Sequence, residues 1–308
     1  METKTKLEGI LIPMPTAFRE DGGIDENGVD ALVDFYLAAG VQGFFALGTH
    51  GQGMVMEIEE RKRVAERIVR RVRGKAPIVL HVGTANTYSS IELAKHGAGL
   101  EVDALALVPP YYYPHNDYEV FAHYKAVAKA VPGVPLFIYD NTETTRVHIT
   151  PPKVLKIQEA ISPSTLAGIK VSFIPFDALV GYVFKLPASI GVFPGSILSL
   201  YSGYSLGVRG AIHPPTTPFP EICVKMFRAL KEGRLEDARQ AHDHLAAISQ
   251  VMGRYLPDHG RAVLGEIMRL RGLPMKRFPR WDCLPLSQQE KEELRKGLIE
   301  TGVALALP

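Results

Sequence analysis

The sequence has only two cysteines among its 308 residues, Cys223 and Cys283, and neither belongs to a C-x-x-C pair or a His/Cys cluster. A disulfide framework or a structural zinc site normally needs more cysteines at closer spacing, so the pattern favours neither. A sparse set of unpaired thiols is typical of proteins in a reducing compartment. We therefore expect a cytoplasmic protein.

An excess of charge of one sign is also missing. Lys and Arg (35) nearly balance Asp and Glu (33), which leaves a net charge of +2. Arginines are dense between Arg61 and Arg73, but four glutamates between positions 57 and 66 interleave with them. Such a mixture indicates a solvated helix face rather than a phosphate-binding stripe. We therefore expect no nucleic acid partner and no anionic membrane surface.

Long hydrophobic runs are missing as well. No apolar stretch reaches 18 residues, and the segment Met1–Lys6 is polar. We therefore expect neither a transmembrane helix nor a secretory signal. Apolar residues nevertheless make up 46% of the chain and charged residues 22%, a balance typical of a globular protein with a sizeable core.

Eight short apolar runs, rich in β-branched and aromatic residues, recur along the chain and predict buried strands. They are Gly9–Ile12, Gly43–Leu47, Ile78–Val82, Ala104–Val108, Leu136–Tyr139, Leu166–Lys170, Ser189–Phe193 and Gly210–Ile212. Their spacing averages roughly 29 residues, about one βα unit.

Segments with helical periodicity follow most of these runs. The predicted helices are Asp25–Ala39, Glu57–Arg73, Ser89–Ala98, Asp117–Ala130, Pro151–Glu159, Phe219–Lys231, Leu235–Arg254, Arg261–Arg271 and Ser287–Thr301. The alternation predicts an α/β protein with a (β/α)₈ TIM barrel, residues 1–232, and a helical C-terminal extension, residues 233–308, packed on it. A doubly wound open sheet is the alternative, although G-x-G-x-x-G does not follow the first strand.

Polar residues that close the predicted strands are the candidates for chemistry, because barrel enzymes react at the carboxyl ends of their strands. Lys170 ends one strand, where burial lowers the pKa of an amine and makes it a nucleophile toward a ketone. Alternatively, Lys170 extends its side chain to the rim and pairs with an acid. Tyr139 ends another strand and is suited to proton transfer, or simply to packing with a hydrated hydroxyl.

The turn after the second strand is the candidate anion site. Gly48 and Gly51 flank Thr49 and His50, and two glycines allow backbone N–H groups to converge on a carboxylate. A single G-x-x-G turn is more often structural. Tyr111–Tyr113 lie between prolines, which predicts a stiff projecting segment. Three aromatic residues in a row more usually pack in a core or an interface.

Eight segments in this order resemble the pyruvate-dependent class I aldolases, the family of dihydrodipicolinate synthase, N-acetylneuraminate lyase and 2-keto-3-deoxygluconate aldolase. They are GILIPMPTAF, GVQGFFALGTHGQG, VGTANT, PPYYYP, LFIYDN, LAGIKVS, GVFPGSI and GVRGAIHP. The resemblance covers nearly the whole chain and implies a Schiff-base enzyme without cofactor or metal.

The resemblance also implies roles for individual residues. Lys170 is expected to form the Schiff base with pyruvate, and Tyr139 to move protons at the reacting oxygen. Thr49 and the amide of His50 are expected to bind the pyruvyl carboxylate, with Gly48 and Gly51 shaping that turn. Ile212 is expected to place a carbonyl near Lys170. Tyr112 corresponds to a tyrosine that family members insert into a neighbouring subunit, which implies a homodimer or homotetramer.

The sequence departs from the family pattern at several positions. His50 stands where many relatives have a threonine of a proton relay, and Gln52 stands where they have glutamate. Thr144 occupies the position of the arginine that binds the second substrate in dihydrodipicolinate synthases. We expect Arg146, two residues on, to take part in substrate binding instead.

These features predict a lyase that joins pyruvate to an aldehyde or cleaves a 2-keto-3-deoxy acid. Dihydrodipicolinate synthesis and hydratase-aldolase chemistry are alternatives within the family. A 2-oxo acid-binding protein without turnover is an alternative from another class. A metal-dependent aldolase would need acidic partners for His81 and His213, and Asp140 alone ends a strand suitably.

Overall fold

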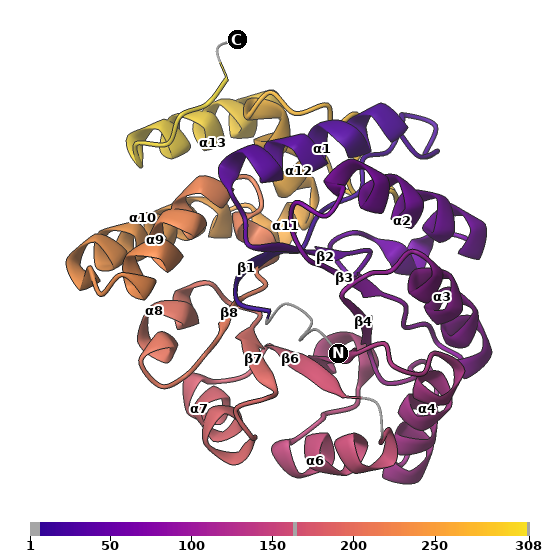
Figure 1. Ribbon diagram of the computed structural model, residues 1–308. Coiled ribbons are helices and arrows are strands. Elements are labelled where there is room, and N and C mark those ends of the chain that lie inside the picture. The colour runs from indigo at the N-terminus through magenta and orange to yellow at the C-terminus, as the bar shows by residue number, and fades with distance from the viewer. Residues whose placement is uncertain (1–6, 163–164, 307–308) are drawn as a thin grey trace.

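The computed structural model describes residues 7–162 and 165–306, so the expectation for Met1–Lys6 concerns residues outside these ranges. Eight strands form the centre of the molecule (Figure 1). They are β1 (Gly9–Ile12), β2 (Gly43–Ala46), β3 (Ile78–His81), β4 (Ala104–Leu107), β5 (Leu136–Asn141), β6 (Leu166–Ser172), β7 (Gly191–Pro194) and β8 (Gly210–Ala211). Each lies at a predicted position.

The strands are parallel and follow the chain order around a barrel. β1 pairs with both β2 and β8, which joins the first strand to the last and leaves β7 and β8 at the two ends of the sheet. Between β7 and β8, the Arg209 amide donates to the Val192 carbonyl (3.0 Å), and the Ile212 amide donates to the Pro194 carbonyl (3.0 Å). The predicted TIM barrel is confirmed, and the open doubly wound sheet is wrong.

Alternation along each strand divides the core into two layers. Phe137 and Tyr139 of β5 lie in the cluster inside the barrel, whereas Leu136 and Ile138 pack in the larger cluster between strands and helices. Both faces of the strand are thus buried, which is why the sequence shows continuous apolar runs. Side chains fill the barrel interior up to its carboxyl-terminal rim.

Helices surround the barrel (Figure 1). They are α1 (Glu26–Ala39), α2 (Ile58–Val72), α3 (Thr87–Gly99), α4 (Asp117–Ala130), α5 (Thr142–Thr145), α6 (Pro151–Ala160), α7 (Phe176–Lys185), α8 (Leu198–Tyr204), α9 (Pro220–Lys231), α10 (Leu235–Gly253), α11 (Leu256–His259), α12 (Ala262–Leu270) and α13 (Gln288–Glu300). The predicted helices are confirmed to within about two residues, which is the uncertainty of helix ends.

Four helices were not predicted as ranges. α5 and α11 are single turns of four residues, and α7 and α8 each contain a glycine, Gly181 and Gly203. Short length and glycine both weaken the helical signal of an isolated segment. These helices are therefore stabilised by packing on the barrel rather than by the helix propensity of their residues.

The C-terminal helices lie beside α1 and α8 on one side of the barrel (Figure 1). α10 packs on α8 and α9, and α13 packs on α10 and α12. The division at residue 232 falls between α9 and α10, and it stays a prediction. Among the described residues, every helix is too short or too polar to span a bilayer.

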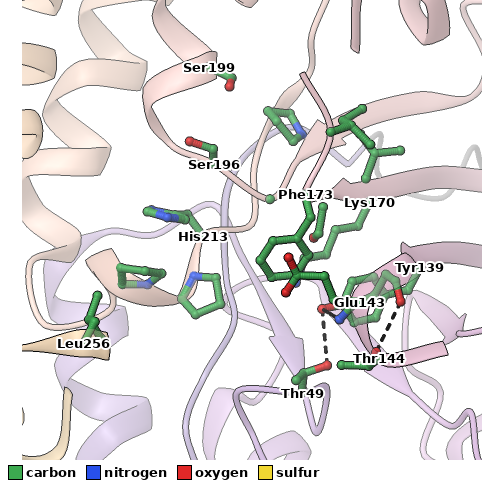
Figure 2. Close-up of a pocket in the computed structure, with 18 of the residues that line it drawn as sticks. Thr49, Tyr139, Glu143, Thr144, Lys170, Phe173, Ser196, Ser199, His213 and Leu256 are labelled. Atoms are coloured by element: carbon green, nitrogen blue, oxygen red, sulfur yellow. Dashed lines mark hydrogen bonds between the residues drawn. The ribbon is translucent and has the colours of Figure 1, made fainter. Parts of the chain in front are cut away.

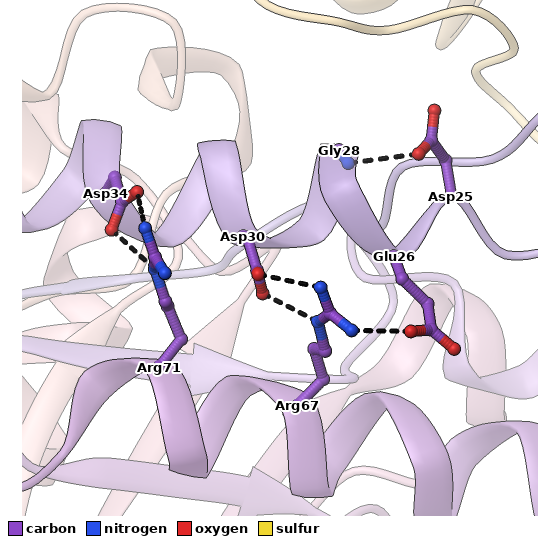
Figure 3. Close-up of polar contacts among 7 residues, drawn as sticks. All are labelled: Asp25, Glu26, Gly28, Asp30, Asp34, Arg67 and Arg71. Carbon is purple, nitrogen blue, oxygen red and sulfur yellow. Dashed lines mark hydrogen bonds and ion pairs between the residues drawn. The ribbon is translucent and has the colours of Figure 1, made fainter.

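The arginine-rich face of α2 is paired with acids on α1 (Figure 3). Arg67 donates to both carboxylate oxygens of Asp30 at 2.8 Å and to Glu26 at 2.5 Å. Arg71 binds Asp34 in the same two-pronged manner. These guanidinium groups are already matched by carboxylates, as the interleaved charge pattern predicts for a helix surface.

Candidate active site

A pocket of about 930 Å³ opens at the carboxyl ends of the strands (Figure 2). β5 and β6 supply Tyr139 and Lys170, and the turn after β2 supplies Thr49. His213 lines the pocket from the segment after β8. Catalytic groups of barrel enzymes gather at this rim, so this cavity is the candidate active site.

Lys170 lies within the rim, with its side chain almost completely buried (2% exposed). Its ammonium nitrogen stands 4.1 Å from the centre of the Tyr139 ring and 4.9 Å from that of Phe45. Burial lowers the pKa of this amine, and the Arg261 charge lowers it further, while Tyr139 opposes both effects. The side chain forms no ion pair with an acid of the described residues, in contrast to the alternative of a rim salt bridge.

Tyr139 pairs in register with Lys170 across β5 and β6, which brings the two side chains together. Its hydroxyl lies 3.3 Å from the Thr49 hydroxyl and accepts a 3.0 Å hydrogen bond from the Asn141 amide. Burial alone would raise the pKa of Tyr139, but the neighbouring Lys170 charge and these hydrogen bonds outweigh it and lower the pKa. The hydroxyl is thus prepared to exchange a proton.

The turn that holds Thr49 is shaped by close backbone contacts. Leu47 and Gln52 adopt left-handed conformations (φ 59° and 58°), and the Thr16 hydroxyl donates to the Gly51 carbonyl at 2.7 Å. A Cβ atom on Gly48 would lie 2.7 Å from the Phe45 ring. The conformation therefore depends on small residues at fixed positions.

Gly53 ends this turn, and substituting it tests how strictly the turn is held. A Cβ atom there would lie 2.2 Å from the Leu47 carbonyl oxygen, a backbone atom that cannot rotate away. We expect Gly53→Ala to lower stability by about 1–3 kcal/mol, the usual cost of overpacking, as measured by denaturant unfolding.

The matched control is Gly181→Ala in α7, where no atom lies within 4 Å of the added Cβ. We expect that variant to be as stable as the parent or more so, because alanine favours a helix. A Gly53→Ala variant that unfolds at the same denaturant concentration as Gly181→Ala would contradict this description of the turn.

His50 lies in the same turn, but its side chain leaves the pocket. Its Nε2 atom is 3.1 Å from the Thr217 hydroxyl, and its Nδ1 atom is 3.1 Å from the Arg261 guanidinium. Since arginine only donates, Nδ1 accepts and Nε2 carries the proton. Burial, with the Arg261 and Lys170 charges, lowers the pKa of His50 far below its usual value. Within the described residues, no hydrogen bond joins His50 to Tyr139, so His50 does not pass a proton directly to that hydroxyl. The Tyr139 hydroxyl contacts Thr49 instead.

Gln52 holds the same turn against the C-terminal extension. Its side-chain carbonyl accepts a 2.7 Å hydrogen bond from the Arg280 amide. An amide oxygen fulfils this acceptor role as a carboxylate would, so the change from the family's glutamate leaves the turn anchored.

Three other predicted residues lie apart from the pocket walls. Arg146 is exposed, caps α5 with φ 59° and does not line the pocket in this conformation of the chain, so its contact with substrate stays a prediction. Tyr112 is 85% exposed and packs edge-on against Tyr113. Ile212 is buried at the end of β8, and its amide bonds the Pro194 carbonyl.

One wall of the pocket comes from the C-terminal helices and was not predicted from the sequence. Arg261, at the start of α12, lines the cavity together with Leu256 and Leu264. These residues lie in helical segments rather than at strand ends, so the search along strand ends passed over them. His213 faces the cavity, and burial with the nearby Lys170 charge lowers its pKa to about 3.

Among the described residues, no group of three or more His, Cys, Asp or Glu side chains is arranged to hold a metal ion. Asp140, the strand-end acid considered for that role, instead accepts hydrogen bonds from His148 (2.8 Å) and the Ile149 amide (3.1 Å). Its carboxylate therefore holds the segment with His148 and Ile149, which follows β5, in place.

Comparisons with known proteins agree with this geometry. N-acetylneuraminate lyase of Rhizobium meliloti is 30% identical over 272 residues, which cover 88% of this chain and 89% of that protein. The probable 2-dehydro-3-deoxy-D-pentonate aldolase YjhH of Escherichia coli K12 is 27% identical and covers 97% of this chain and 98% of its own.

The crystal structure of Escherichia coli K12 YagE, a prophage protein of the dihydrodipicolinic acid synthase family solved with pyruvate, superimposes with a TM-score of 0.86 at 25% identity. The match covers 97% of this chain and all (100%) of that one. The model of the dihydrodipicolinate synthetase family matches residues 6–301. The chain therefore belongs to the dihydrodipicolinate synthetase family.

Proposed function

We propose that this protein is a carbon–carbon lyase that forms a Schiff base between Lys170 and the 2-oxo carbon of pyruvate or of a 2-keto-3-deoxy acid. The observation that carries the proposal is the buried amine of Lys170 over the Tyr139 ring, at the rim of a pocket large enough for both substrates. Relatives named as lyases and aldolases support it.

The reaction begins when the neutral Lys170 amine attacks the ketone carbon and forms a carbinolamine. Tyr139 donates a proton to the departing hydroxyl, which leaves as water and gives the imine. Loss of a proton from C3 then gives an enamine, whose C3 attacks the aldehyde carbon while the aldehyde oxygen takes a proton. Water hydrolyses the resulting imine and frees Lys170; cleavage runs the same steps backwards.

The other predicted residues have supporting roles in this proposal. Thr49 and the His50 amide bind the pyruvyl carboxylate, within the turn shaped by Gly48 and Gly51. Ile212 presents a carbonyl toward the amine. Tyr112, exposed in one chain, reaches the site of a second copy in a homodimer or homotetramer. No cofactor or metal takes part, and the expected location is cytoplasmic.

Exchange of the pyruvate methyl protons in D₂O, followed by NMR, tests this function. Enamine formation removes a methyl proton, so an active enzyme replaces methyl hydrogen by deuterium without any aldehyde. A protein that binds pyruvate without exchange would instead be the 2-oxo acid-binding protein of the alternative hypothesis.

The pH dependence of this exchange follows from the state of the amine. Only neutral Lys170 attacks a ketone, so the rate rises with pH and levels off as the amine loses its proton. Because the pKa of Lys170 is lowered, we expect the midpoint of this rise below the value of about 10.4 that an exposed lysine shows. The midpoint belongs to the coupled Lys170–Tyr139 pair.

The variant Arg261→Met tests whether the Arg261 charge sets the pH dependence of exchange. The Arg261 charge lowers the pKa of Lys170, so removing it should move the rising limb to higher pH. Two results would contradict the expected electrostatics: an exchange rate in the parent enzyme that rises only near the pKa of an exposed lysine, or a rise that moves to lower pH in the variant.

A further inference from the structure

Arg261 is a partly buried cation without a counter-ion. The one hydrogen bond of its guanidinium group in the described part of the chain joins it to His50, a neutral ring. Arg67 and Arg280, which are also partly buried, have acids as partners, Asp30 and Glu60. Arg61 and Arg209 instead donate to backbone carbonyls, which Arg261 does not do within the described residues. A guanidinium that lines a cavity with unused donors is costly unless an anion arrives to meet it.

A chain of hydrogen bonds holds Arg261 in place. Arg261 donates to Nδ1 of His50, Nε2 of His50 donates to the Thr217 hydroxyl, and that hydroxyl donates to the Pro214 carbonyl at 2.9 Å. His50 and Thr217 are buried, and Arg261 and Pro214 are partly buried. The chain gives His50 a function as the residue that positions Arg261.

Arg261 belongs to the pocket wall made by α11 and the start of α12. Figure 2 shows Leu256, from this same wall, facing the cavity on the side away from Lys170 and Tyr139. Lys170 and this wall line the same cavity, so a substrate attached to Lys170 through its 2-oxo carbon has room to extend its far end toward the wall. Leu256, Pro257 and Leu264 line the same wall as Arg261 with apolar groups, and a less polar wall strengthens the attraction of a guanidinium for an anion.

We infer that Arg261 binds a carboxylate at the far end of the substrate, so that the aldehyde joined to pyruvate is one that itself carries a carboxylate. The planar guanidinium fork matches a carboxylate with two parallel hydrogen bonds. The inference rests on the proposed function, because Lys170 must hold the 2-oxo end. Among the lining residues, Glu143 is the one acid, and within the described residues it forms no ion pair with Arg261.

Matched pairs of 2-oxo acids test the inference without any aldehyde. We would measure by calorimetry the affinities of 2-oxoglutarate against 2-oxopentanoate, and of 2-oxoadipate against 2-oxohexanoate. Each pair shares the 2-oxo acid head and the chain length and differs only in the far carboxylate. In at least one pair we expect the parent protein to bind the dicarboxylate roughly 10- to 100-fold more tightly, the scale of a hydrogen-bonded charge pair.

Arg261→Met should bring that ratio close to one, and Arg261→Lys should keep part of it. Arg239→Met is the matched control, because Arg239 is an exposed arginine of α10 outside the pocket walls and its loss should leave the ratio unchanged. His50→Leu should lower the ratio, whereas His50→Asn, which keeps an acceptor, should restore part of it.

Two outcomes would overturn the inference. One is a parent protein that binds both members of each pair equally. The other is an Arg261→Met variant that weakens both members by the same factor, which would place Arg261 at the shared 2-oxo acid head. Absence of pyruvate proton exchange would instead count against the proposed function, and the affinity ratio would still be measured.

Discussion

Lys170→Met is expected to reduce the exchange of pyruvate methyl protons by about 10⁴-fold or more, the scale seen when a nucleophile is removed. Methionine fills the space between the Tyr139 and Phe45 rings but has no amine to form an imine. Because burying an amine is unfavourable, the variant should be at least as stable as the parent. Activity is measured by NMR and stability by thermal unfolding.

The control is Lys153→Met, which removes a lysine that pairs with Asp117 on the outer surface. Exchange should be unchanged in this variant. Appreciable exchange by Lys170→Met, with an intact fold, would assign the chemistry to another group of the pocket.

Tyr139→Phe is expected to slow exchange by roughly 10²- to 10⁴-fold, the usual contribution of general acid–base catalysis. The phenyl ring keeps its contacts with Phe45 and Lys170, but the hydroxyl that joins Thr49 and Asn141 is lost. The carbinolamine must then lose water without an internal acid. Single-turnover measurements of imine formation report the slowed step.

Tyr124→Phe distinguishes catalysis from the general loss of a buried hydroxyl. The Tyr124 hydroxyl is buried and donates to the Leu107 carbonyl at 3.1 Å, on the helix side of β4. Its loss should lower stability and leave the exchange rate per folded molecule unchanged. An exchange rate of Tyr139→Phe within about threefold of the parent would contradict the assigned proton transfer.

The strands and most helices were predictable because parallel strands covered on both faces form continuous apolar runs. Those runs place Tyr139 and Lys170 at strand ends, and in a closed barrel strand ends converge. The pairing of these two residues follows from register, which the sequence pattern alone does not specify, and the structure supplies it.

The rest of the site depends on tertiary contacts. Arg261 follows Lys170 by 91 positions (261 − 170) and enters the pocket because α11 and α12 fold back over the rim. Arg146, by contrast, is near Tyr139 in sequence, but the short α5 turns it outward. The side-chain direction of His50 depends likewise on Arg261 and Thr217, which are distant in sequence.

The most direct measurement of the central claim is reduction with borohydride in the presence of pyruvate, followed by digestion and mass analysis of the peptides. The account predicts that the peptide with Lys170 gains the mass of one reduced pyruvate adduct and that peptides with other lysines do not. An unmodified Lys170 peptide, or an adduct on a different lysine, would contradict it.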